Sequence, residues 1–144
     1  MNNNKVKVAV VDGKGGGIGK ALIERIKKEG LNIELIALGT NSSATTNMLK
    51  GGADEAATGE NAIIYNSGRV DVILGVIAII QANSMMGELT PDMAMAIGES
   101  NALKILIPTS RCNIKIAMPE EFNLQQSIEY AIIRLKEYLV EIKD

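Results

Sequence analysis

The segment DGKGGGIGKAL, which begins at Asp12, has five glycines within seven positions. Glycines in such a loop allow positive φ values, let the backbone approach a bound group closely and let a helix pack against a strand. Exposed amides at the start of a helix favour an anion, and Lys14 or Lys20 would add positive charge. The segment therefore predicts a site for a phosphate or another anion. The residues assigned to it are Asp12, Gly13, Lys14, Gly15, Gly16, Gly17, Ile18 and Gly19.

Polar residues also follow three other predicted strands. Gln81, Asn83 and Ser84 follow the central strand, and the remaining two sets are Thr40, Asn41, Ser42 and Thr109, Ser110, Arg111. Right-handed crossovers bring the carboxyl ends of parallel strands to one edge of a sheet, so these residues should converge on the glycine loop. From these sets, the ligand site is predicted to include Thr40, Asn41, Ser42, Asn83 and Ser84.

The elements that position these loops are indicated by hydrophobic patterns. Continuous apolar runs predict strands at 5–12, 32–39, 71–80 and 104–108, with further strands at 53–58 and 113–118. Helices are expected at 18–29, 44–50, 60–67 and 90–99, and from 123 onward. Thr90 before Pro91 is a helix N-cap pattern, and Asn123 with Gln126 forms a capping-box pattern. This alternation predicts a three-layer Rossmann-like or flavodoxin-like α/β domain, with a mostly parallel sheet of about five strands and helices on both faces.

Composition excludes several classes of function. The 144 residues, 47% hydrophobic, fit one domain over 1–144. Without His there is no Ser-His-Asp triad or His-type zinc site, and the single Cys112 cannot form an internal disulfide. A net charge of −2, no Trp and one Phe argue against nucleic acid and anionic membranes as partners. The first residues lack signal-peptide architecture, so a cytoplasmic location is expected.

The spacing of Gly13, Gly17 and Gly19 resembles the cofactor loop of short-chain dehydrogenases. That resemblance covers the first half of the chain and implies a dinucleotide cofactor. The family's catalytic Tyr-x-x-x-Lys is not matched, because Tyr65 is followed by Arg69 at that spacing. Residues 39–42, GTNS, lack the acid that holds the ribose hydroxyls of NAD. They tolerate a 2′-phosphate better than an acid would, which favours NADP, although no Arg is nearby.

Two further resemblances involve the same loop. GKGGGIGKA is similar to the deviant Walker A motif of ParA/MinD-type ATPases, but it has an extra glycine, and Ala21 replaces the hydroxyl residue that holds magnesium. The whole chain resembles a bacterial family of unknown function over VVDGKGGGIGKAL, ALGTNSSATTNMLKGGADEAATGENAIIYN, QANSMMGELTPDMAMAIGES and KILIP. That family implies the extent of the domain and no activity.

The sequence thus predicts a small protein that binds a nucleotide or dinucleotide, NADP in preference to NAD, with no complete catalytic constellation and no metal site assigned. One alternative is a non-catalytic regulatory or interaction module that pairs subunits as a homodimer through Met85, Met86, Met93 and Met95. Another is a magnesium-dependent phosphate-handling enzyme that uses Asp12, Glu60 or Glu88. Acids that complement helix dipoles near helix N-termini are common, and this is the preferred interpretation of Glu60 and Glu88.

Overall fold

The computed structural model describes residues 5–109, 112–119 and 122–143, in which five parallel strands form one sheet. Their order across the sheet is β3-β2-β1-β4-β5, the order of the first five strands of the Rossmann fold. The strands are β1 (Val6–Asp12), β2 (Ile33–Gly39), β3 (Glu55–Thr58), β4 (Val72–Val76) and β5 (Leu103–Ile107). Because every pairing is parallel, all strands end at the same edge of the sheet, as the sequence predicted.

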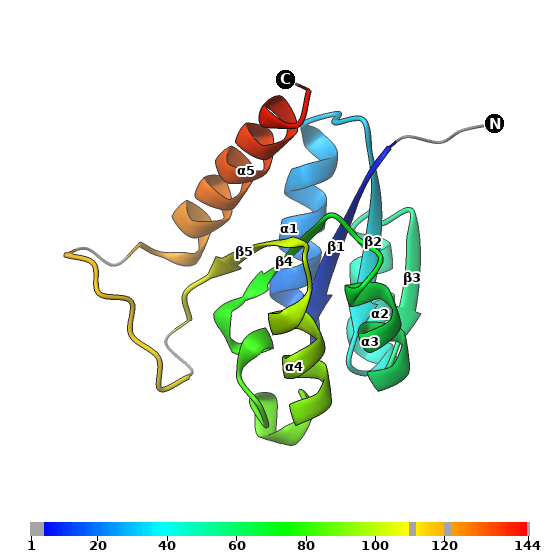
Figure 1. The fold of residues 1–144 in the computed structure, drawn as a ribbon, viewed down its shortest axis with the longest axis vertical. Coiled ribbons are helices and arrows are strands. Elements are labelled where there is room, and N and C mark those ends of the chain that lie inside the picture. Colours follow the sequence, from blue (N-terminus) through cyan, green and yellow to red (C-terminus); the bar gives the residue numbers. More distant parts are fainter. Residues whose placement is uncertain (1–4, 110–111, 120–121, 144) are drawn as a thin grey trace.

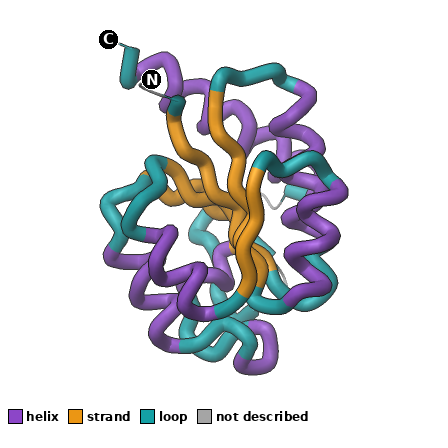
Figure 2. Tube along the Cα trace, turned by 90° about the vertical axis from the view of Figure 1, so that its right-hand side faces the viewer, coloured by secondary structure: helices purple, strands orange, loops and turns teal. Residues whose placement is uncertain are grey.

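Helices cover both faces of this sheet (Figures 1 and 2). One face packs against α1 (Gly17–Lys28), α2 (Ser42–Lys50) and α5 (Leu124–Glu141), and the other against α3 (Glu60–Ser67) and α4 (Pro91–Glu99). Alternate residues of β1 enter the two cores: Val8 and Val10 lie in the first, and Ala9 and Val11 in the second. The predicted three-layer α/β class with a parallel sheet is therefore confirmed.

The helix boundaries follow the capping patterns of the sequence. The Thr90 hydroxyl accepts a hydrogen bond from the Met93 amide, with Pro91 in the first turn of α4. Asn123 and Gln126 form a reciprocal capping box at the start of α5. No helix within the described part of the chain is both long and apolar enough to cross a membrane.

The strand predicted over 71–80 is wrong in its second half. β4 ends at Val76, and Ile77–Ile80 form a turn of 3-10 helix, here called η1. The turn folds Ile79 back over Gly75, where an added Cβ would lie 2.9 Å from Ile79 Cδ1. A continuous apolar run does not distinguish a strand from a buried helical turn, so the pattern could not give this boundary.

The strand predicted over 113–118 is also absent. These residues lie in an extended stretch after β5 that leaves the body of the domain before α5 (Figure 1). Ile116 and Met118 are exposed there. A β-prone pattern needs a neighbouring strand to become one, and within the described residues this stretch has none.

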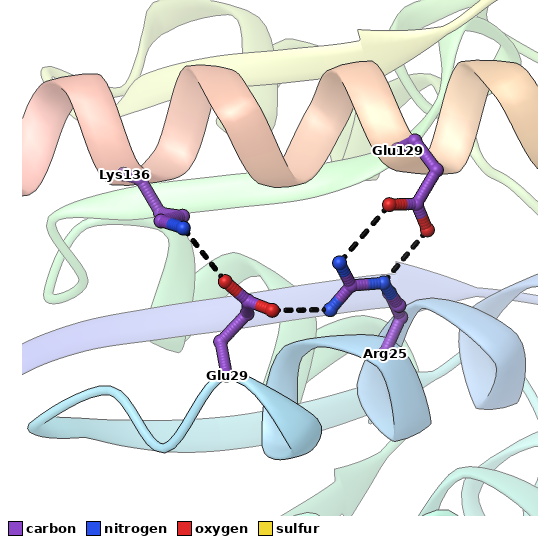
Figure 3. A network of polar contacts seen from close by, with 4 residues as sticks. All are labelled: Arg25, Glu29, Glu129 and Lys136. Carbon is purple, nitrogen blue, oxygen red and sulfur yellow. Dashed lines mark hydrogen bonds and ion pairs between the residues drawn. The ribbon is translucent and has the colours of Figure 1, made fainter.

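Helix α5 is joined to α1 by charged side chains as well as by apolar packing (Figure 3). Arg25 donates from Nε and Nη2 to the two carboxylate oxygens of Glu129, at 2.7 and 3.0 Å. Its Nη1 donates to Glu29 at 2.7 Å, and Lys136 donates to the other oxygen of Glu29 at 2.8 Å. This four-residue chain of ion pairs links α5 to α1 beside their apolar contact.

Candidate functional site at the glycine loop

The loop after β1 begins at Asp12, whose carboxylate lies beneath it. Oδ1 accepts a hydrogen bond from the Gly13 amide at 2.8 Å, and Oδ2 accepts one from the Gly19 amide at 2.7 Å. Asp12 is only 7% exposed. Burial raises the pKa of this carboxyl, the two amide hydrogen bonds oppose that shift, and the charge of Glu88 adds to it. Asp12 thus holds the strand end to the first turn of α1 and is itself occupied by backbone donors.

The glycines of the loop fall into two groups. Gly13, Gly16 and Gly19 are buried and leave no room for a side chain. A Cβ on Gly16 would lie 2.8 Å from the Ala44 backbone, and Gly16 has a φ of +71°. In contrast, Gly15 and Gly17 are exposed, and a Cβ on either would meet no atom within 4 Å. Packing therefore explains three of these glycines and not the exposed two.

The side chain of Glu88, from the loop between β4 and α4, closes over the glycine loop. Its Oε1 accepts hydrogen bonds from the Lys14 amide at 2.9 Å, the Thr40 hydroxyl at 2.6 Å and the Asn41 side-chain amide at 2.9 Å. The Thr40 bond makes the largest contribution to lowering the pKa of Glu88, followed by the Lys14 amide. One internal carboxylate oxygen therefore occupies donors of the predicted anion site.

The loop after β2 lies against the glycine loop, as predicted. The Thr40 amide donates to the Asp12 carbonyl at 3.0 Å, and Asn41 Nδ2 donates to the Lys14 carbonyl at 3.0 Å. Asn41 is also the N-cap of α2, because its Oδ1 accepts from the Ala44 amide. Ser42 is exposed in the first turn of α2.

Asn47 in α2 adds a contact that the sequence analysis missed. Its side-chain amide donates to the Gly15 carbonyl at 2.8 Å. Nothing in the local pattern indicates this contact, which depends on how α2 packs beside α1.

Residues after β4 contribute unequally to the site. Ser84 donates its hydroxyl to the Ala78 carbonyl, and the Asn83 amide donates to the Leu89 carbonyl, so both shape their own loop. Gln81 donates to Asn113, in the stretch after β5. Of the last predicted set, Thr109 is described, whereas Ser110 and Arg111 lie outside the described residues.

Backbone strain is concentrated at this site. Among the described residues, the non-glycine positions with positive φ are Lys14 at 51°, Asn83 at 65°, and Met85 and Met86 at 57° each. All four belong to the glycine loop or to the facing loop that carries Glu88. Such conformations cost roughly 1–3 kcal/mol each and collect where function requires them. Strain thus marks the same two loops as the hydrogen bonds to Glu88.

The carboxylates suggested for magnesium do not form one cluster. Glu60 accepts a hydrogen bond from the Thr90 hydroxyl and thereby ties α3 to α4. Within the described residues, no group of three or more His, Cys, Asp or Glu side chains could hold a metal ion. The methionines predicted to pair subunits do not share one surface, since Met93 is buried in the core while Met86 is 94% exposed.

An open cavity of about 360 Å³ lies on a different surface, between α1 and α5. Arg25 and Glu129 line it together with Leu124 and Ile128. Arg25 and Glu129 are already paired with each other there, as Figure 3 shows. Glu24 and Glu129 balance the two cations of the lining, Arg25 and Lys28, so the cavity offers no net positive charge for an anion, and the glycine loop remains the stronger candidate.

The loops that meet at Glu88 lie where the fold changes direction. The chain leaves β1 toward α1 on one face of the sheet and leaves neighbouring β4 toward α4 on the other. In open α/β sheets, ligands bind in the crevice formed at such a switch point. The position of the loop, its two exposed glycines and the local strain all point to this edge of the sheet.

The chain is similar in fold to a crystal structure of a dodecameric FMN-dependent UbiX-like decarboxylase from Escherichia coli O157:H7. The two share 18% sequence identity with a TM-score of 0.47, over 91% of this chain and 77% of that one. No match to a curated protein was found. Residues 7–140 match the family described as a domain of unknown function, DUF3842, so the chain belongs to that family.

Proposed function

We propose that the protein binds a small anionic ligand of the nucleotide type at the carboxyl edge of its sheet, between the glycine loop and the loops after β2 and β4. The observation that carries this proposal is the pair of exposed glycines, Gly15 and Gly17. Neither is required by packing or by a positive φ. A phosphate that approaches the backbone closely would require both positions to lack a side chain.

Backbone donors are available beside those two glycines. Among the described residues, the amides of Gly15, Gly17 and Ile18 donate to no protein acceptor. They lie before and within the first turn of α1, where the helix dipole favours negative charge. The side chains of Lys14 and Lys20 would add charge that salt can screen. These groups supply the donors that a phosphate or pyrophosphate requires.

Among dinucleotides, we propose NADP in preference to NAD. The reason is the absence of an acid at the end of β2, where Gly39 is followed by Thr40 and Asn41. The Glu88 carboxylate at Thr40 and Asn41 would repel a 2′-phosphate, so this preference requires Glu88 to move away. Replacing Asn41 by Asp should change the difference in binding free energy between NADP and NAD by about 1–2 kcal/mol in favour of NAD.

A thermal-shift panel tests the binding proposal. NAD, NADP, ATP, phosphate and magnesium are added separately to the wild-type protein and to Gly17→Val. A ligand at 100 times its Kd should add about 2.7 kcal/mol to the stability of a protein that binds it. Gly17→Val should fold and lose that gain, because the side chain fills the space in front of the loop.

Gly98→Val provides the matched control for this panel. Gly98 is also an exposed helical glycine with open space around it, but it lies in α4. The control should keep the ligand-induced gain in stability. Equal gains in wild type, Gly17→Val and Gly98→Val would show that the glycine loop does not bind the ligand.

A further inference from the structure

Three donors from two loops converge on one atom of a third loop, Glu88 Oε1. The Lys14 amide, the Thr40 hydroxyl and the Asn41 amide lie 2.6–2.9 Å from this oxygen. Charge-assisted hydrogen bonds of this length are among the stronger polar contacts in proteins. This is the coordination that an oxygen of a bound carboxylate or phosphate would receive.

Glu88 and a ligand oxyanion cannot use these donors together. The Lys14 amide belongs to the glycine loop, and each amide hydrogen has one strong acceptor in this structure. The buried Asp12 adds a second carboxylate close enough for the charge of Glu88 to raise its pKa. An approaching anion therefore meets occupied donors and the negative charge of Glu88, and withdrawal of Glu88 relieves both.

The segment that carries Glu88 is built so that it can change shape locally. Asn83, Met85 and Met86 have left-handed backbone conformations, and Gly87 has a φ of +90°. Met86 is 94% exposed and therefore adds little packing. Leu89, directly after Glu88, is fully buried and fixes the end of the segment to the core. Because Leu89 is anchored, a movement of 83–88 would leave α4 in place, and it would take Met85 out of its contact with the second core.

We propose that the Glu88 carboxylate is a built-in competitor for the anion position, and that an oxyanion of the ligand displaces it and moves segment 83–88 outward. The inference rests on the proposed function, since it describes how that same site is regulated. Glu88 holds the crevice closed in the free protein. The ligand class it admits carries a carboxylate or phosphate able to accept from Lys14, Thr40 and Asn41.

Calorimetric titration of inorganic pyrophosphate and NADP into four proteins tests this device. They are the wild type, Glu88→Gln, Glu88→Ala and the control Glu55→Gln, which lies at the start of β3 and away from the carboxyl edge. Glu88→Ala should bind roughly 5- to 100-fold more tightly than wild type, the usual range for coupled equilibria. Glu88→Gln keeps a hydrogen-bond acceptor without the charge, so its affinity should lie between those of wild type and Glu88→Ala. The affinity of Glu55→Gln should equal that of wild type.

The outcomes separate this inference from the proposed function. Equal affinities in all four proteins would overturn the proposed role of Glu88 as a competitor, but not the proposed binding site. Weaker binding by both Glu88 variants would also overturn it, because Glu88 would then be a ligand contact. No binding by any of the four would overturn both proposals. If Glu88→Ala fails to fold, the comparison of Glu88→Gln with wild type decides the question.

Fluorescence tests the movement separately. The chain has no tryptophan, so Met86→Trp places a single such fluorophore on the exposed part of the segment. Adding saturating pyrophosphate should change its emission when Glu88 is present. In the double variant with Glu88→Ala, the emission should already be changed, and pyrophosphate should alter it little. Binding with unchanged emission in the Met86→Trp protein would overturn the outward movement.

Discussion

The carboxylate of Asp12 caps the helix that follows it, with Oδ2 lying 2.7 Å from the Gly19 amide. Its other oxygen accepts from the Gly13 amide, so one side chain closes both ends of the glycine loop. The close approach depends on Gly19, where an added Cβ would lie 2.8 Å from Asp12 Cβ. The loop is therefore held from below by an acid, and its exposed side is left for other groups.

Replacing Asp12 by Ala should destabilise the fold by about 1–3 kcal/mol for each buried amide left without an acceptor. Asp12→Asn should also destabilise, because its amide nitrogen would face one of the two backbone donors. Urea unfolding followed by circular dichroism measures both effects. Asp92→Asn, an exposed acid in the first turn of α4, is the control and should cost less than about 1 kcal/mol. Similar losses at both positions would contradict the capping role.

The two groups of glycines should respond oppositely to substitution. Gly16→Ala should cost at least about 2 kcal/mol, because the residue has a positive φ and its Cβ would clash with the Ala44 backbone. Gly17→Ala should leave stability within about 1 kcal/mol of wild type or raise it, since Ala favours a helix. Chemical unfolding midpoints compare the two variants. A large loss of stability in Gly17→Ala would show that this glycine is structural.

The two Asn caps should differ in their contribution to stability. Asn123→Ala removes a capping box and should cost about 1 kcal/mol. Asn41→Ala removes a cap and also the bonds to Lys14 and Glu88, so about 2–3 kcal/mol is expected. Differential scanning calorimetry of both variants measures the difference. Equal losses would mean that the contacts between the loops add nothing to the fold.

Acid should weaken the attachment of α5 through Glu29. Hydrogen bonds from Lys136 and then Arg25 lower the pKa of Glu29 from 4.5 to about 2. A carboxyl whose pKa is lower in the folded than in the unfolded protein stabilises the fold at pH values above its unfolded-state pKa. This stabilisation is lost as the pH falls toward the folded-state pKa. The stability difference between wild type and Glu29→Gln should therefore shrink between about pH 4.5 and 2.

Urea titrations at several pH values across that window measure the effect. Glu24→Gln is the control, because Glu24 is exposed on the same helix and has no hydrogen-bond partner among the described residues. The difference in free energy of unfolding between Glu24→Gln and wild type should stay constant over this pH range. A Glu29→Gln difference that is equally flat would exclude the ion-pair network of Figure 3 as a pH-dependent attachment.

How much the sequence predicts depends on whether the signal is local. The first strand, its loop and α1 follow from neighbouring residues, as do the caps at Thr90 and Asn123. The end of β4 at Val76 does not, because apolar residues continue to Ile80. The strand expected at 113–118 is absent for a related reason, because its residue pattern does not show whether a neighbouring strand is available for pairing.

The site itself shows the same division. Convergence of the loops after β1 and β2 follows from parallel topology and could be predicted. The bond from Lys14 to Glu88 joins residues 74 positions apart and depends on the turn after β4 that the sequence analysis missed. Gly19, predicted as a residue of the ligand site, also lies too close to Asp12 to accept a side chain, a contact that the glycine spacing does not indicate.

The central position of β1 has a consequence for how the chain is made. Synthesis delivers β1 first, and β2 can pair with it soon afterwards, but the opposite edge pairs with Val72–Leu74, about sixty residues later. Until then that edge presents Val8, Ala9 and Val10 with free backbone groups. A nascent chain stalled before Val72 would thus expose an apolar template for pairing with other chains. Emergence of β4 from the ribosome covers this edge of β1, but Val72–Val76 then present the next open edge, which stays unpaired until β5 follows.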